Sequence, residues 1–167
     1  MALFVKLKLG GDMSIIELLT IATATILGLF AGGMLTEALL LVPYFRSLKA
    51  EDFYRQRHDF GPRLYRFYSP LTIGATLSAL TTAIAVIVLD PKNSGPSLIA
   101  ALLSLSILST YFLYFRRANL SFAEQRLTAT ELNRELGRWS GVHNFRTALA
   151  IASALVSILA AIKVASS

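Results

Sequence analysis

The chain has 167 residues, of which 54% are hydrophobic and 16% are charged, and its mean hydropathy is +0.59. Soluble domains carry about 25% charged residues, and here the apolar residues are gathered in four blocks, which indicates a membrane protein rather than a soluble one. The net charge is +6, and the absence of cysteine excludes disulfides, thiolate-bound metals, covalently attached haem of the c type and cysteine nucleophiles.

After a short, loosely ordered start over residues 1–13, the first apolar block covers residues 14–42 and predicts a membrane helix. Its 29 residues exceed the roughly 7–15 residues in the apolar region of a signal peptide. At about 1.5 Å per residue the helix is about 40 Å long, so it crosses a hydrocarbon core of about 30 Å at a tilt. Gly28 and Gly32 form a pair of small residues through which a second copy of the chain could pack. An incidental pair of glycines is the alternative interpretation.

The composition of residues 43–66 predicts a polar loop that begins at Pro43. Basic and aromatic residues are mixed in this loop, which suits the headgroup region of a bilayer. The second membrane helix is expected over residues 69–89, with Ser69 as its N-cap and Pro70 at its first position.

A turn rich in proline, glycine and asparagine at residues 90–96 leads to a third helix, expected over residues 97–115. Because this turn is short, the second and third helices should form an antiparallel hairpin. Residues 116–141 then predict a second basic loop. Two pairs within it match the capping-box pattern at the start of a helix, namely Ser121 with Glu124 and Thr128 with Glu131.

Residues 130–138 predict a short amphipathic interfacial helix before the fourth membrane helix, which is expected over residues 142–164. Gly137 and Gly141 are expected to bend the chain between the two. For residues 1–167 the prediction is therefore one all-α domain. It is an integral membrane four-helix bundle with one additional interfacial helix.

Lys and Arg are distributed unequally over the two sides of this bundle. The two basic loops hold eleven of them, whereas the N-terminal segment, the turn and the C-terminal segment hold four. Cytoplasmic loops of membrane proteins carry an excess of Lys and Arg. We therefore expect both loops in the cytoplasm, both termini outside and the protein in the plasma membrane. The basic residues also suit anionic headgroups, so the expected partners are membrane lipids and a lipophilic small molecule, and not nucleic acid.

Glu37 is the most informative single residue, because it lies inside the first membrane helix. A carboxylate near hydrocarbon is costly, and it normally faces the bundle interior and finds a partner there. Trp139, His143 and Arg146 share one face at the cytoplasmic start of the fourth helix. Because Glu37 lies near the end of the first helix on the same side, we expect it to pair with Arg146 or with His143.

Two interpretations of this cluster stay open at this point. In one, the charges only neutralise each other between two helices, and Trp139 anchors the chain at the membrane interface. In the other, the residues line a polar pocket in which His143 accepts or donates a proton. A less favoured variant brings His58 from the first loop to Glu37 and His143 to form a metal site, although no ligand spacing in the sequence supports it.

Four features that succeed one another along the chain resemble a known family. They are the glycine-rich first helix ending at Leu41-Val42-Pro43, the Phe67-Tyr68-Ser69-Pro70 start of the second helix, Asn119, and the motif made by Trp139, His143, Asn144, Arg146 and Thr147. Together they resemble the anthrone oxygenase-like family of small four-helix membrane proteins, over most of the chain.

This resemblance implies an oxidoreductase that acts on a lipophilic aromatic or quinone-like substrate. Characterised members oxidise polycyclic anthrones to anthraquinones with oxygen and without a classical cofactor, so none is expected here, although a metal or haem stays open. The resemblance implies that Trp139 binds the substrate and that Asn144 positions it, while His143 deprotonates a phenol and Arg146 stabilises the phenolate. Glu37 joins the catalytic set from the burial argument alone. The alternative is a non-enzymatic membrane module that binds a lipid or small molecule, or a subunit of a larger complex.

Overall fold

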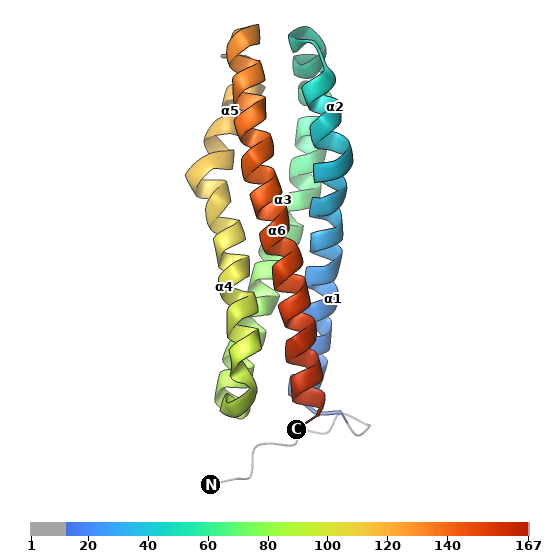
Figure 1. Ribbon diagram of the computed structural model, residues 1–167, viewed down its shortest axis with the longest axis vertical. Coiled ribbons are helices and arrows are strands. Elements are labelled where there is room, and N and C mark those ends of the chain that lie inside the picture. Colours follow the sequence, from blue (N-terminus) through green and yellow to red (C-terminus); the bar gives the residue numbers. More distant parts are fainter. Residues whose placement is uncertain (1–12, 167) are drawn as a thin grey trace.

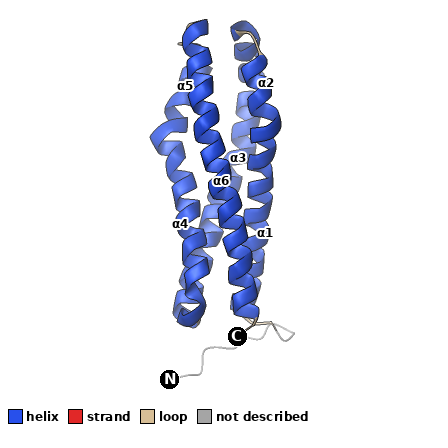
Figure 2. Ribbon diagram, in the orientation of Figure 1, coloured by secondary structure: helices blue, strands red, loops and turns tan. Residues whose placement is uncertain are grey.

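The computed structural model describes residues 13–166, and all the regular structure in this range is helical (Figures 1 and 2). The helices form four long antiparallel rods with short connections at their ends. The first rod consists of α1 (Ile15–Thr36), the π-helical η1 (Glu37–Leu41) and α2 (Val42–Ser47), and the second rod is α3 (Ala50–Leu89). The third rod begins after the short η2 (Pro91–Asn93) and consists of α4 (Ser94–Thr110), the π-helical η3 (Tyr111–Phe115) and α5 (Arg116–Ala123). The fourth rod is α6 (Ala129–Ala165).

Each of the four rods is long and apolar enough to cross a membrane. Every rod contains a run without Asp, Glu, Lys or Arg, and these runs cover residues 18–36, 67–89, 93–115 and 147–162. At about 1.5 Å per residue the runs measure about 24 to 35 Å, which matches a hydrocarbon core of about 30 Å. The chain is therefore a multi-pass membrane protein built as a four-helix bundle, as the sequence predicts.

The rods form a ring in which α1 contacts α3 and α6, and α4 contacts the same two helices. The start of α1, the turn at η2 and the end of α6 lie together at one end, which we call the terminal end (Figure 1). The connections from α2 to α3 and from α5 to α6 lie at the opposite end, which we call the connection end. The expected antiparallel hairpin of the second and third membrane helices is present as α3 and α4.

Small residues allow the rods to approach closely in the apolar part of the bundle. The core there is rich in fully buried alanines, among them Ala75, Ala79 and Ala150. Buried hydroxyl groups cross between rods, as in the 2.8 Å contact between the hydroxyl oxygens of Thr23 and Thr82. Because lipid tails are as apolar as leucine side chains, such close packing and hydrogen bonding drive helix association in membranes.

The prediction of a polar loop at residues 43–66 is wrong. The chain breaks its helix only around Leu48 and Lys49, and α3 then runs without interruption past Pro62 and Pro70. Ser69 is consequently inside a helix and is not an N-cap. The physical reason is tertiary: one face of α3 packs against the bundle along its length, and Phe53 near its start is only 2% exposed.

The expected loop at residues 116–141 is also largely helical, and the interfacial helix is simply the first part of α6. Between α5 and α6 the chain is non-helical only at residues 124–128, and α6 continues through Gly137 and Gly141 without interruption. The capping box of Thr128 and Glu131 is present. The prediction of a second capping box at Ser121 is wrong, because Ser121 lies inside α5 and its hydroxyl donates to the carbonyl of Ala118.

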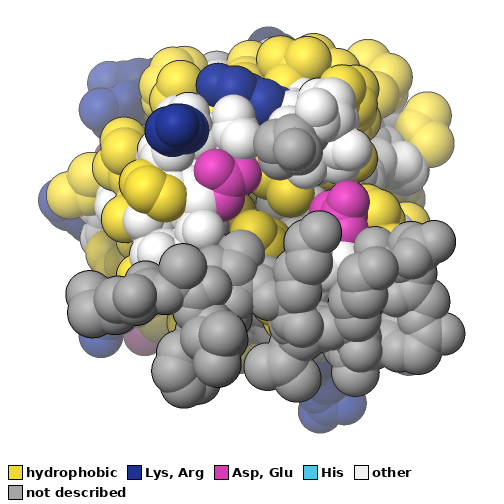
Figure 3. Space-filling view, turned by 90° about the horizontal axis from the view of Figure 1, so that it is seen from below, with side chains coloured by type: hydrophobic (Ala, Val, Ile, Leu, Met, Phe, Trp, Pro, Cys, Tyr) yellow, Lys and Arg dark blue, Asp and Glu magenta, His cyan; other side chains and the backbone are white. Residues whose placement is uncertain are grey.

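The terminal end carries few charged side chains among the described residues. Seen from this end, scattered basic and acidic groups lie between apolar and uncharged polar ones, and part of the view is covered by residues outside the described range (Figure 3). The loosely ordered start is expected over residues 1–13, of which residues 1–12 lie outside the described part of the chain. Most described arginines lie toward the connection end, where the predicted basic loops turn out to be helix.

Candidate functional site

The connection end of the bundle contains a second core that differs in composition from the alanine-rich core below it. It is dominated by aromatic rings, namely Phe45, Phe53, Phe115, Phe122 and Trp139. The rings meet edge to face, as in the pair of Phe53 and Phe122 with centroids 5.3 Å apart. Edge-to-face packing of this kind is favourable for aromatic pairs. This aromatic core lies directly beside the polar residues that the sequence singled out.

Two π-helical turns flank the same stretch of α6. In η1 the amide of Val42 donates to the carbonyl of Glu37, and in η3 the amide of Arg116 donates to the carbonyl of Tyr111. Bonds over five residues widen a helix locally, and such turns occur frequently at functional sites. The first π turn brings Glu37 into the interior, and the second directs Phe115 onto α6.

His143 is enclosed between rings and backbone and is only 1% exposed. Its ring stacks on Trp139, with centroids 5.4 Å apart and an interplanar angle of 11°, and the Phe115 ring meets it edge-on at 6.4 Å. Its Nε2 lies 3.3 Å from the carbonyl oxygen of Met34. A carbonyl oxygen only accepts hydrogen bonds, so Nε2 carries the hydrogen and Nδ1 is the nitrogen that can accept a proton in the neutral ring.

Arg146 lies one turn further along the same face of α6. Its Nη2 donates to the hydroxyl of Thr72 at 3.3 Å, and its guanidinium carbon lies 5.0 Å from the centroid of the Phe115 ring. A cation over an aromatic face at this distance is a favourable contact. However, Nε of Arg146 and Nε1 of Trp139 are both buried without a hydrogen-bond acceptor among the described residues. Within residues 13–166, these two buried N–H groups on one face of α6 therefore donate no hydrogen bond.

Glu37 is 8% exposed and points into the bundle, as the sequence predicts. The charged groups that act on it electrostatically are Arg146 and Arg57, and the nearby Tyr68 hydroxyl donates to the carbonyl of Gly33 at 3.0 Å. Among the described residues no ion pair of 4.0 Å or less involves Glu37. The structure therefore shows no direct pairing of Glu37 with Arg146 or with His143: Arg146 bonds to Thr72, and His143 bonds to the backbone of α1.

Arg57 is the site residue that sequence reasoning missed. Its Nη2 donates to Oδ1 of Asn119 at 2.9 Å, and it faces Glu37. A solvated loop over residues 43–66 would keep Arg57 away from both neighbours. The available signal was periodicity: Phe53, Arg57, Tyr68 and Thr72 recur at helical spacing, which places them on one face of a helix that continues past Pro62.

Two predicted residues do not join this cluster. Asn144 is exposed and lies on another side of α6. His58 is exposed on α3 and its Nδ1 lies 3.1 Å from Oδ1 of Asp59. No group of three or more His, Asp or Glu side chains in residues 13–166 lies close enough to hold a metal ion. The structure therefore does not assemble Glu37, His58 and His143.

A groove of about 470 Å³ lies next to the cluster, between the first rod and α6. It is lined by Ala38, Val42, Pro43, Arg46 and Ser47 on one side and by Ser140 and Asn144 on the other. Glu37, His143 and Arg146 do not line it. The groove is open to the surroundings of the bundle, whereas the cluster is closed by its own packing.

Comparisons with protein-family models, with curated proteins and with solved structures find no match for this chain. The resemblance to the anthrone oxygenase-like family therefore stays a prediction from the motifs alone. The geometry of the cluster is the remaining basis for assigning a function.

Proposed function

We propose that this membrane protein binds a lipophilic aromatic or quinone-like molecule beside Trp139 and Arg146, and that it oxidises this molecule with oxygen. The observation that carries the proposal is the pair of buried N–H groups, Nε1 of Trp139 and Nε of Arg146, that lack an acceptor among the described residues. A buried donor without a partner costs about 1–3 kcal/mol. A ligand oxygen that accepts from either group removes the cost of that group.

The surroundings of the two donors define the chemistry of the ligand. The rings of Phe115 and Trp139 offer aromatic faces and edges, and the Arg146 guanidinium favours an oxygen with negative charge. A quinone carbonyl or a phenolate oxygen attached to a flat ring system has both properties. The position at the border of the apolar segments suits a molecule that reaches the site from the membrane.

The oxidation step follows from the resemblance and from the orientation of His143. Nδ1 of His143 takes a proton from the ring methylene or hydroxyl of an anthrone-type substrate, and Arg146 stabilises the resulting anion. The anion reacts with molecular oxygen. One oxygen atom becomes the new quinone carbonyl, two hydrogens leave the ring carbon, and the second oxygen atom leaves as water.

Trp139 makes this proposal testable, because it is the single tryptophan of the chain. An anthrone or anthraquinone bound beside it should quench the intrinsic fluorescence of the purified protein in a saturable way. Turnover is followed by the appearance of the anthraquinone absorption band. His143→Ala should reduce turnover by roughly 10²–10⁴-fold. His58→Ala, which removes the exposed histidine, is the matched control and should leave the rate unchanged.

The outcomes separate the two parts of the proposal. No saturable quenching by either compound contradicts binding at Trp139. Quenching without turnover leaves a binding protein and no enzyme, and equal turnover of His143→Ala and wild type removes His143 from the mechanism. A Soret band, or stoichiometric iron or copper in the purified protein, would contradict oxidation without a cofactor.

One observation favours the alternative of a non-enzymatic membrane module. His143 is almost fully enclosed by Trp139, Phe115 and the backbone of α1, and neither the groove beside it nor the hydroxyl-lined cavity lower in the bundle reaches it. In this case the cluster joins the four rods and neutralises Glu37. The fluorescence titration distinguishes the two functions, since a purely structural cluster has no aromatic ligand.

For the orientation we infer that the connection end faces the cytoplasm and the terminal end faces outward, in the plasma membrane. The inference rests on the eleven Lys and Arg of residues 43–66 and 116–141, against four toward the other side. Both segments belong to rods that meet at the connection end.

A further inference from the structure

We propose that the groove between the first rod and α6 binds the phosphate of an anionic phospholipid. The groove is large enough for a headgroup, with a volume of about 470 Å³. One cationic side chain, Arg46, lies at its rim together with the polar side chains of Ser47, Ser140 and Asn144. No carboxylate of residues 13–166 lines it, so its charge complements a phosphate.

The donors around the groove are free to bind such a group. Within residues 13–166, the side chains of Arg46, Ser140 and Asn144 have no hydrogen-bond or ion-pair partner, whereas Arg55 and Arg126 pair with acidic neighbours. A guanidinium and an amide are good donors to phosphate oxygens.

The depth of the groove argues for a lipid rather than a soluble anion. Apart from the buried Glu37, the first rod stays uncharged up to Arg46, and the uncharged run of α6 begins at residue 147, so the groove lies at the border of the apolar segments. Leu35 and Leu39 are 40% and 65% exposed on the adjoining turns of the first rod. These side chains offer an apolar surface to the acyl chains of a lipid whose headgroup is in the groove.

The test is a thermal-unfolding measurement in neutral detergent with added phosphatidylglycerol, phosphatidylcholine or inorganic phosphate. Wild type should show a larger rise of the unfolding midpoint with phosphatidylglycerol than with phosphatidylcholine. Arg46→Gln should lose this difference. The matched control is Arg55→Gln, which makes the same charge change at an exposed arginine and should keep the difference.

Three results would overturn the proposal. Equal midpoints with the two lipids show that there is no preference for anionic headgroups. Loss of the difference in both variants shows a general effect of charge. A rise with inorganic phosphate as large as that with phosphatidylglycerol identifies the occupant as a soluble anion.

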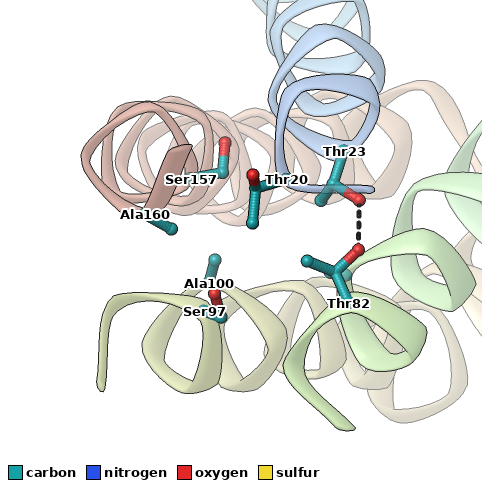
Figure 4. Close-up of a pocket in the computed structure, with 8 residues that line it drawn as sticks. Thr20, Thr23, Thr82, Ser97, Ala100, Ser157 and Ala160 are labelled. Carbon is teal, nitrogen blue, oxygen red and sulfur yellow. Dashed lines mark hydrogen bonds between the residues drawn. The ribbon is translucent and has the colours of Figure 1, made fainter. Parts of the chain in front are cut away.

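A second and independent inference concerns a cavity in the apolar part of the bundle, nearer the terminal end. All four rods line it: α1 with Thr20 and Thr23, α3 with Ala79 and Thr82, α4 with Ser97 and Ala100, and α6 with Ser157 and Ala160 (Figure 4). Its volume is about 10 Å³, which corresponds to one water molecule.

Ser97 supplies the reason for an occupant. Its side chain is 3% exposed and faces Thr20 across the cavity, and its Oγ has no hydrogen-bond partner among the described residues. Thr20 and Ser157 also line the cavity, but their hydroxyl oxygens are directed away from Ser97 (Figure 4), and both donate to carbonyls of their own helices. We infer that one ordered water occupies the cavity and accepts from Ser97, in a region where direct hydrogen bonds already connect α1 with α3 and α4 with α6.

Ser97→Ala distinguishes a wet cavity from a dry one. If the water is present, the substitution removes its donor and lowers the unfolding midpoint in detergent. If the cavity is dry, the substitution removes a buried hydroxyl without a partner, and the midpoint rises or stays the same. Ser106→Ala, at an exposed serine that bonds only to its own helix, is the control and should have no effect. A structure that resolves ordered waters should show one beside Ser97, and an empty cavity there would overturn the inference.

Discussion

At the scale of single residues, Glu37 is buried in the electrostatic field of two arginines from different rods, although neither forms an ion pair with it. Arg146 comes from α6 and Arg57 from α3, and each also bonds an uncharged side chain, Thr72 and Asn119 respectively. Removing one partner of a buried charge is strongly destabilising, even where the pair itself adds little net stability. The arginines therefore stabilise the fold mainly because, without them, Glu37 would be a buried charge with no compensation.

Arg57→Met should lower the free energy of unfolding by about 2 kcal/mol, because it leaves Oδ1 of Asn119 without its donor and Glu37 with one arginine fewer. Arg55→Met, two residues earlier on the exposed face, should cost less than about 1 kcal/mol, since its ion pair with Asp52 is exposed to solvent. Chemical denaturation in detergent measures both. Equal costs for the two variants would show that Arg57 does not stabilise the buried cluster.

At the scale of elements, the rods are longer than the membrane requires, and their extensions build the candidate site. The α3 helix has 40 residues and α6 has 37, which at about 1.5 Å per residue is about 55 to 60 Å. The extra length projects at the connection end, where the aromatic core lies. The widened turns η1 and η3 occur on the two shorter rods, at the level where these extensions begin to pack.

The start of α6 offers a test of how these extensions are stabilised. Thr128→Ala should cost about 1 kcal/mol of stability, because it removes the side-chain acceptor that caps the amide of Glu131. Ser121→Ala is the matched control, since that hydroxyl bonds only to its own helix and caps nothing. The same denaturation assay reports both variants, and a cost for Ser121→Ala as large as that for Thr128→Ala would contradict the assignment of the cap.

At the scale of the whole molecule, topology follows from the even number of membrane crossings. The described ends of the chain lie at one end of the bundle, so they share one side of the membrane (Figure 1). Gly28 and Gly32 are exposed on α1 with no other side chain or rod within 4 Å of where a Cβ would be. Packing of a second copy through this face stays a prediction.

The orientation can be measured directly, because the chain has no cysteine of its own. Single cysteines at Ser94, beside the turn at η2, and at Gln125, in the connection before α6, should label from opposite sides. We expect a membrane-impermeant maleimide to label Ser94→Cys in intact cells and Gln125→Cys only after lysis. The reverse pattern would overturn the proposed orientation.

Much of this architecture could be predicted because the backbone hydrogen bonds of a membrane helix join residues that are close in sequence. A run of about 20 uncharged residues has to satisfy its backbone within a helix when it crosses a bilayer, so the crossings and the hairpin of α3 and α4 follow from composition alone. The burial of Glu37 and the shared face of Trp139, His143 and Arg146 follow from helical spacing in the same way.

Only the tertiary structure decided the conformation of the segments beyond the apolar runs. Residues 43–66 have the composition of a loop, and they are helical because Phe53 and its neighbours pack against rods that are distant in sequence. For the same reason Arg57 joins Glu37, whereas Asn144 and His58 do not. The sequence by itself determined how many helices cross the membrane and which face of α6 is buried. Which residues from other rods reach that face depends on long-range packing, and this placed two N–H groups that have no acceptor within residues 13–166 beside an enclosed histidine.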